Sequence, residues 1–177
     1  MNSEEIRIEE LTAENFAPDA LDDFVRMQSV TEVYRRIEGE YRLVLHPFEE
    51  DWSPERRREK AAEILSGEYQ TFGAFAGNRV VGEIMLERTL RQGRLVVSSL
   101  HVSQEYRHQG IGRMLFACAR KAAEEAGAKE LYISACSAKE TIAFYRAMGC
   151  TLADPVIEEF AEEEPCDLQM VCPVGGL

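Results

Sequence analysis

Long apolar runs and targeting patterns are missing from this sequence of 177 residues. No stretch approaches the roughly 18 consecutive apolar residues that a membrane-spanning helix requires. The first residues, Met1 to Glu5, lack the basic and then apolar layout of a secretory signal, so we expect a cytoplasmic protein. No internal repeat or interdomain linker is found, and the length suits one domain over residues 1–177.

Cysteine is present without the spacing that a metal site or a disulfide framework requires. The five cysteines are an odd number and include no Cys-x-x-Cys pair. We therefore expect no metal.

Positive charge is also in short supply. The chain has 20 basic and 32 acidic residues, which gives a formal net charge of −12. A nucleic-acid surface needs clustered Lys and Arg to replace counterions, so that class of partner is disfavoured. The acidic balance favours a cationic partner instead.

The spacing of apolar residues and turn signals predicts an α/β fold with a mostly antiparallel, mixed sheet. Tight turns at Gly77-Asn78 and Gln92-Gly93 join three strands at the centre of that sheet. The expected strands cover residues 5–10, 71–76, 79–90, 94–103, 130–135 and 167–174, with a hairpin through 33–37 and 41–45. The expected helices cover residues 13–33 in one or two pieces, 53 to about 67, 112–127 and 139–148.

Two helix starts have recognisable capping residues. Ser53-Pro54 places a hydroxyl cap before a proline at the first helical position. Ser137 and Glu140 have the spacing of a capping box. The acidic run from Glu158 to Glu164 is expected to be a solvated surface.

The loop Arg107-His108-Gln109-Gly110-Ile111-Gly112 lies between a predicted strand and a predicted helix. A helix amino terminus and a glycine loop together present several backbone amides to one point, which suits a diphosphate. Gly110 and Gly112 would allow close backbone approach. The third glycine of the dinucleotide fingerprint is missing, and so is the Gly-Lys-Ser/Thr of a P-loop.

Two motifs, taken together, resemble a known family. The pattern Arg-x-x-Gly-x-Gly after Leu100-His101-Val102 is similar to the acetyl-CoA signature of the GNAT superfamily of N-acetyltransferases, and Ala143 to Cys150 is similar to its second motif. The resemblance implies a GNAT-like fold with a sheet of about six to seven strands flanked by helices. Residues 1–70 would carry acceptor-side elements, 71–150 the acetyl-CoA-binding core and 151–177 the C-terminal strands.

The family's activity is direct attack of an amine on acetyl-CoA, the co-substrate, in a cleft where the strands ending at Val102 and Ala135 splay apart. Ser137 stands beside the position of a frequent family asparagine, where it could substitute for that residue or only cap its helix. The expected acetyl-CoA-binding residues are Leu100, His101, Val102, Arg107, His108, Gln109, Gly110, Ile111, Gly112, Arg113, Ser137 and Tyr145.

The resemblance places Tyr145 at the general-acid position. A phenol with a pKa of about 10 stays protonated at neutral pH and can donate to a leaving thiolate; the alternative is that it only packs and hydrogen-bonds the sulfur. Val96 to Ser99 offers no base, so Glu83 on the neighbouring strand is the preferred base and Glu87 is expected in a surface salt bridge. His101 alternates away from Ser98 and is expected to be structural.

The acceptor is predicted from the segment His46 to Trp52, in which aromatic residues accompany three consecutive carboxylates. Such a segment could bind a cationic amine; the alternative is a loop anchored on the core by its aromatic residues. The expected acceptor-binding residues are Phe48, Glu49, Glu50 and Ser98. The expected function is acetylation of a small cationic amine, polyamine-like or an antibiotic, by a possible homodimer; a peptide acceptor and a non-catalytic acyl-CoA sensor are the alternatives.

Overall fold

The computed structural model describes residues 4–175, and the expected domain limits at residues 1–3 and 176–177 lie outside them. A seven-stranded sheet with the order β1-β4-β5-β6-β7-β9-β8 forms the centre of the fold, and β2 and β3 form a separate hairpin. The predicted fold class, including the number of strands, is confirmed. The strands are β1 (Ile6–Glu10), β2 (Gln28–Ile37), β3 (Glu40–Glu50), β4 (Tyr69–Ala76), β5 (Arg79–Glu87), β6 (Arg94–Val102), β7 (Glu130–Ala135), β8 (Thr151–Leu152) and β9 (Leu168–Pro173). The helices are α1 (Pro54–Leu65), α2 (Ile111–Glu125), α3 (Lys139–Ala147) and α4 (Glu158–Glu163), with a 3₁₀ turn at Gln104–Tyr106.

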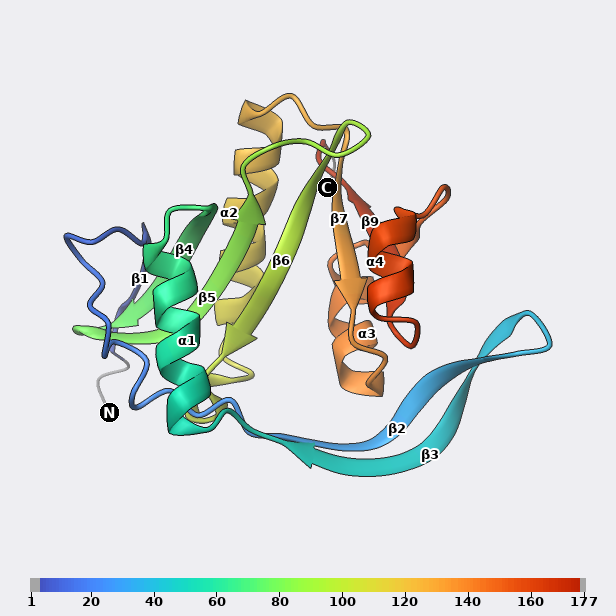
Figure 1. Cartoon of the computed structure of the whole chain (residues 1–177), viewed down its shortest axis with the longest axis horizontal. Helices are drawn as coiled ribbons and strands as arrows, with labels where there is room; N and C mark the ends of the chain where they lie inside the picture. Colours follow the sequence, from blue (N-terminus) through green and yellow to red (C-terminus); the bar gives the residue numbers. More distant parts are fainter. Residues whose placement is uncertain (1–3, 176–177) are drawn as a thin grey trace.

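Helices cover both faces of the sheet. Leu115 and Phe116 of α2 and Ile142 of α3 are buried in the main core on one face. Ala61 and Ile64 of α1 are buried on the opposite face, in a second core. Figure 1 shows α1 in front of the β4–β5 part of the sheet and α2 behind it.

The central parallel pair, β6 and β7, is joined over only part of its length. Arg94 to Val97 pairs with Glu130 to Ile133, and no pairing continues beyond these residues. A bulge between β5 and β6 leaves Ser98 as an extra residue, because Met85 faces Ser99 while Leu86 faces Val97. The pairing of β6 with β7 ends at Val97 and Ile133, and Figure 1 shows the two strands diverging toward their carboxyl ends.

The predicted hairpin is confirmed, and it is longer than expected. β2 and β3 pair from Gln28–Glu50 to Ile37–Glu40, around a turn in which Glu38 and Gly39 both have positive φ. Figure 1 shows this hairpin passing below α3 and projecting beyond the sheet. Val33 of β2 anchors the hairpin to the segment before α3. This residue is 1% exposed and forms a β-bridge with Ala138.

The predicted helix over residues 13–33 is wrong. Isolated turns occupy residues 13–15 and 18–23, and β2 already begins at Gln28. Pro18 lacks an amide hydrogen and disfavours helical geometry in the residue before it. The apolar residues that suggested a helix, Phe16, Leu21 and Phe24, are buried against α1 from these turns.

The other helix predictions are mostly confirmed. Ser53 caps α1 by accepting a hydrogen bond from the Arg56 amide. The capping box at Ser137 is wrong, because the residue preceding α3 is Ala138 and the Ser137 hydroxyl instead accepts from Arg35. The acidic run forms the short helix α4, and its glutamates are exposed. Within residues 4–175 none of the helices has the length and apolar character needed to cross a bilayer.

Candidate active site

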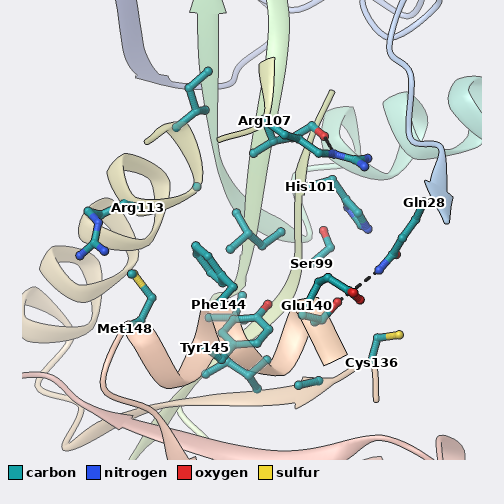
Figure 2. Close-up of a pocket in the computed structure, with 18 of the residues that line it drawn as sticks. Gln28, Ser99, His101, Arg107, Arg113, Cys136, Glu140, Phe144, Tyr145 and Met148 are labelled. Atoms are coloured by element: carbon teal, nitrogen blue, oxygen red, sulfur yellow. Dashed lines mark hydrogen bonds between the residues drawn. The ribbon is translucent and has the colours of Figure 1, made fainter. Parts of the chain in front are cut away.

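A cleft of about 800 Å³ opens where β6 and β7 separate. Its walls are β6, the following loop, the amino-terminal end of α2, the end of β7 and the inner face of α3. Arg26, which precedes β2, and Gln28 and Ser29 at the start of β2 line the cleft on a further side. Figure 2 shows side chains from these elements directed into one space.

The edge of β6 beyond Val97 is free to bind an extended polar molecule. The Ser103 amide donates to Val81 on the β5 side, so alternation along the strand directs the backbone groups of Leu100 and Val102 to the opposite side, toward the cleft. The Val102 carbonyl on that side accepts from Arg107, which leaves the Val102 amide and both backbone groups of Leu100 for a ligand. An extended amide-containing chain can add to such an edge as an extra strand would. This edge fits the pantetheine arm that the family resemblance implies.

The loop after β6 presents open amides at the start of α2. His108 and Gly110 both have positive φ, and Gly110 precedes the helix without a side-chain cap. The first amides of a helix lack internal partners and favour anions. The predicted pyrophosphate loop therefore has a suitable backbone, and the exposed Arg113 lies at the same end of the cleft.

Glycine is favoured at the two positions of this loop for different structural reasons. Gly110 adopts a φ of 83°, which favours glycine although an added Cβ would meet no atom within 4 Å. An added Cβ at Gly112 would lie 3.1 Å from the Phe144 ring. Gly112 therefore allows α2 and α3 to approach each other.

Arg107 holds the loop in place through its side chain. Its guanidinium donates to the carbonyl oxygens of Val102 at 2.9 Å, Met27 at 2.6 Å and Arg26 at 2.9 Å. Burial, together with the charge of Arg26, lowers the pKa of Arg107. The sequence placed Arg107 among the residues that bind the co-substrate, whereas the structure uses its donors to tie the loop to the segment before β2.

Tyr145 lies on the cleft-facing side of α3. The residue is 7% exposed and lines the cleft. Its hydroxyl has no hydrogen-bond partner within residues 4–175, and it is not among the buried unpartnered atoms there, which are Arg26 Nε, Arg57 Nε and Thr71 Oγ1. The hydroxyl is therefore accessible from the cleft. Burial raises the pKa of Tyr145, so the hydroxyl stays protonated at neutral pH.

Glu83 is the centre of a buried polar network. Its carboxylate is fully buried and accepts hydrogen bonds from Ser99 Oγ at 3.0 and 3.2 Å. Nδ1 of His101 lies 2.6 Å from Glu83 Oε1. Lys60 Nζ donates to Ser99 Oγ at 2.7 Å and lies 4.0 Å from Glu83 Oε1.

The charge state of this network follows from its surroundings. Burial raises the pKa of the Glu83 carboxyl, but the charge of Lys60 and the hydrogen bonds from His101 and Ser99 outweigh it and hold the pKa below its ordinary value. Burial lowers the pKa of His101 against the opposing effect of Glu83, and the charges of Arg26 and Lys60 act in the same direction as burial. The network thus contains an ionised Glu83 and a neutral His101.

Glu83 does not line the cleft, whereas His101 does. The sequence assigned the opposite roles, with Glu83 as base and His101 as structural. The signal that would have found His101 is the pairing of Glu83 with His101 on β5 and β6, which becomes visible only when the strand register is known. Glu87 forms the expected salt bridge, with Arg91 Nε at 2.6 Å.

Of the predicted acceptor residues, only Ser98 lines the cleft. Phe48 packs in the hairpin beside Val30 and Val33. Glu49 accepts a hydrogen bond from Ser29, and Glu50 pairs with Arg26 at 3.4 Å. The segment reaches the site through Trp52 instead, whose ring meets that of His101 edge-on at 4.8 Å.

Several residues without a predicted role line the cleft, whereas the predicted residue Ser137 does not. Ser137 is buried and does not line the cleft. Gln28, Cys136 and Asp167 do line it, although no sequence motif marks them. Gln28 lies in the segment that was mistaken for helix, and Asp167 accepts a hydrogen bond from Ser134 at 3.0 Å at the entry to β9.

Arg107→Met should lower both stability and co-substrate affinity, whereas Arg113→Met should lower affinity alone. The first change leaves three carbonyls without their charged donor, a cost of about 2–3 kcal/mol in the free energy of unfolding. The second removes an exposed cation. Urea unfolding and calorimetric titration with coenzyme A measure the two effects. Equal stability of the two variants would contradict this role of Arg107.

The comparisons with known proteins agree with the geometry of the cleft. Residues 37–150, more than half of the chain, match the sequence pattern described as the Acetyltransferase (GNAT) family. No curated protein sequence matches the chain.

Solved structures share the fold over nearly the whole chain. A nourseothricin acetyltransferase superposes with a TM-score of 0.73 at 21% identity, covering 96% of this chain and 99% of its own. The PaiA N-acetyltransferase of Thermoplasma acidophilum, in complex with coenzyme A, has a TM-score of 0.61 at 19% identity, with coverage of 96% and 99%. The ribosomal-protein-S18-alanine N-acetyltransferase of Escherichia coli has a TM-score of 0.60 at 16% identity, with coverage of 98% and 96%. With its free β6 edge, its open loop amides and its matching sequence pattern, the chain belongs to the GNAT family of acetyltransferases.

Proposed function

We propose that this protein transfers the acetyl group of acetyl-CoA to a primary amine of a small cationic acceptor. The observation that carries the proposal is the meeting of three features in one cleft: the free edge of β6, the open amides before α2 and the accessible hydroxyl of Tyr145. These features supply, in that order, a site for an amide-containing arm, a site for a diphosphate and a proton donor.

The roles of the residues follow from their positions. The backbone of Leu100 and the amide of Val102 would hold the pantetheine arm, and the amides from His108 to Arg113 the diphosphate. Acetyl-CoA bound there would supply an activated thioester. The Tyr145 hydroxyl donates a proton to sulfur as the carbon–sulfur bond breaks, because it is protonated at neutral pH and has no competing partner in residues 4–175.

Acidic and polar residues in the lining of the cleft support a cationic substrate. Asp167, Glu140 and Gln28 line the cleft, and Glu50 neutralises part of the charge of Arg26, which also lines it. The net charge of −12 would also attract a cation over distance. The similar structures described above include enzymes named for nourseothricin and for an alanine of a ribosomal protein, so both small-molecule and peptide amines belong in a test.

A panel of amines should show which acceptor class is used. We expect coenzyme A release from acetyl-CoA with at least one polyamine or cationic antibiotic, such as a streptothricin, and weaker or no release with peptides. Thiol release is measured spectroscopically, and mass spectrometry confirms the acetylated amine. Saturable acetyl-CoA binding without turnover of any amine would favour a sensor, and preference for a peptide would overturn the choice of acceptor.

Tyr145→Phe should lower kcat by about 100-fold at neutral pH and leave acetyl-CoA affinity close to that of the wild type. The folded state should keep its stability, since the lost hydroxyl has no hydrogen-bond partner among the described residues. Tyr41→Phe in the hairpin is the matched control and should keep full activity. If Tyr145→Phe turns over at the wild-type rate, Tyr145 is not the acid.

A further inference from the structure

We infer that His101 is the catalytic base that takes the proton from the acceptor amine, and that Glu83 and Lys60 are positioning residues that act through it. The inference rests on the proposed function, since it assigns a role within the same transfer reaction. It also changes the role of Glu83 from that of a base in contact with substrate to that of a buried partner of the base.

The hydrogen bond to Glu83 fixes which nitrogen of His101 carries the proton. A carboxylate only accepts hydrogen bonds, so Nδ1 must donate across the 2.6 Å that separates it from Glu83 Oε1. In the neutral ring this leaves the lone pair on Nε2. Nε2 has no hydrogen-bond partner in residues 4–175 and is not among the buried unpartnered atoms of that range, so it is accessible.

The ring of His101 is held in place at the wall of the cleft. His101 lines the cleft with 22% of its side chain exposed, while the ring of Trp52 packs against it and stacks in turn on Phe24 at 5.5 Å. Figure 2 shows His101 and Tyr145 on different walls of the cleft, with Ser99 between them in this view. A base and an acid on separate walls suit a reaction in which one proton leaves nitrogen and another reaches sulfur.

Lys60 explains why Glu83 stays ionised without contact with solvent. The lysine side chain is only 5% exposed, and it approaches Glu83 both directly and through Ser99 Oγ. A buried carboxylate is stable only when a nearby positive charge and hydrogen bonds compensate for lost hydration. This buried arrangement on α1, β5 and β6 is otherwise unused by the reaction.

The proton balance of the transfer is complete with these groups. His101 Nε2 takes one proton from the ammonium form of the acceptor, and the resulting imidazolium is stabilised by Glu83. The neutral amine forms a carbon–nitrogen bond to the acetyl carbon, and the carbon–sulfur bond breaks. Tyr145 gives its proton to the departing sulfur and recovers one from the new amide nitrogen. His101 then releases its proton to solvent, so the products are the amide, the free thiol and one proton.

The charged groups facing His101 come from three elements and predict the direction of each pH effect. Glu83 of β5 raises the pKa of His101, whereas Lys60 of α1 and Arg26 before β2 lower it, together with burial. The net pKa lies below the ordinary value of 6.5. Because the base must be unprotonated, activity should fall only at acidic pH, as the pH drops through this lowered value.

The first test is acceptor-independent. Long-range ¹H–¹⁵N NMR on the full chain distinguishes the two neutral tautomers of histidine, and the sequence has only three histidines to assign. We expect His101 to be neutral at pH 7 with its proton on Nδ1, and to titrate below pH 6.5. A proton on Nε2, or a charged ring at pH 7, would overturn the inference. His46→Gln removes a distant exposed histidine and serves as the assignment control.

The second test compares the NMR titration of His101 with the pH dependence of kcat in matched variants. Glu83→Gln should move the acidic limb of the kcat profile, and the NMR titration of His101, to lower pH. Lys60→Met should move both to higher pH, and Lys60→Arg should restore the wild-type profile. Any of these variants that fails to fold is excluded by its NMR spectrum, and the others still give the comparison.

The size of the loss in kcat distinguishes a catalytic base from a residue that only supports the fold. His101→Gln should lower kcat by about 100-fold while acetyl-CoA affinity is kept, and His46→Gln should be fully active. A kcat for His101→Gln within threefold of the wild type would refute the role of His101 and leave the proposed function standing. If no amine is acetylated by the wild type, the proposed function fails and this role fails with it, whatever the tautomer.

Discussion

The separation of β6 from β7 after Val97 is the constraint on which the site depends. Two parallel strands that remained paired would use their backbone groups on each other, and the cleft would be closed by the sheet. The bulge that leaves Ser98 unpaired turns β6 at the point where pairing stops. The free edge, the cleft and the exposure of His101 and Tyr145 to a common space all follow from this local failure of strand pairing.

Buried charged side chains hold the protein chain in place on both sides of the cleft. The Arg107 guanidinium donates hydrogen bonds to three carbonyl oxygens and so fixes the loop relative to the segment before β2. Glu83 of β5 holds His101, and Ser99 of β6 and Lys60 of α1 in turn hold Glu83. Ion pairs without solvent are costly unless fully hydrogen-bonded, so their presence beside the cleft is better explained by the positioning of reactive groups than by stability alone.

Sequence reasoning located the parts of the site that depend on local chain geometry. The loop from Arg107 to Gly112 and the strand before it are marked by glycines and by alternation, and Tyr145 is marked by the resemblance of Ala143 to Cys150 to the family's second motif. The segment from residue 13 to 33 was misread because turns that bury Phe16, Leu21 and Phe24 imitate helical spacing. The pairing of Glu83 with His101 depends on the register between β5 and β6, and the position of Gln28 in the cleft depends on the hairpin. Neither could be predicted from the residue pattern of a single strand.

Residue-resolved amide hydrogen exchange with and without coenzyme A tests most directly whether the opened edge of β6 is the binding surface for acetyl-CoA. We predict new protection at the amides of Leu100 and Val102 and in the loop from His108 to Arg113, with little change in the β2–β3 hairpin tip. Saturable binding that leaves these amides exchanging at their unbound rates would contradict it.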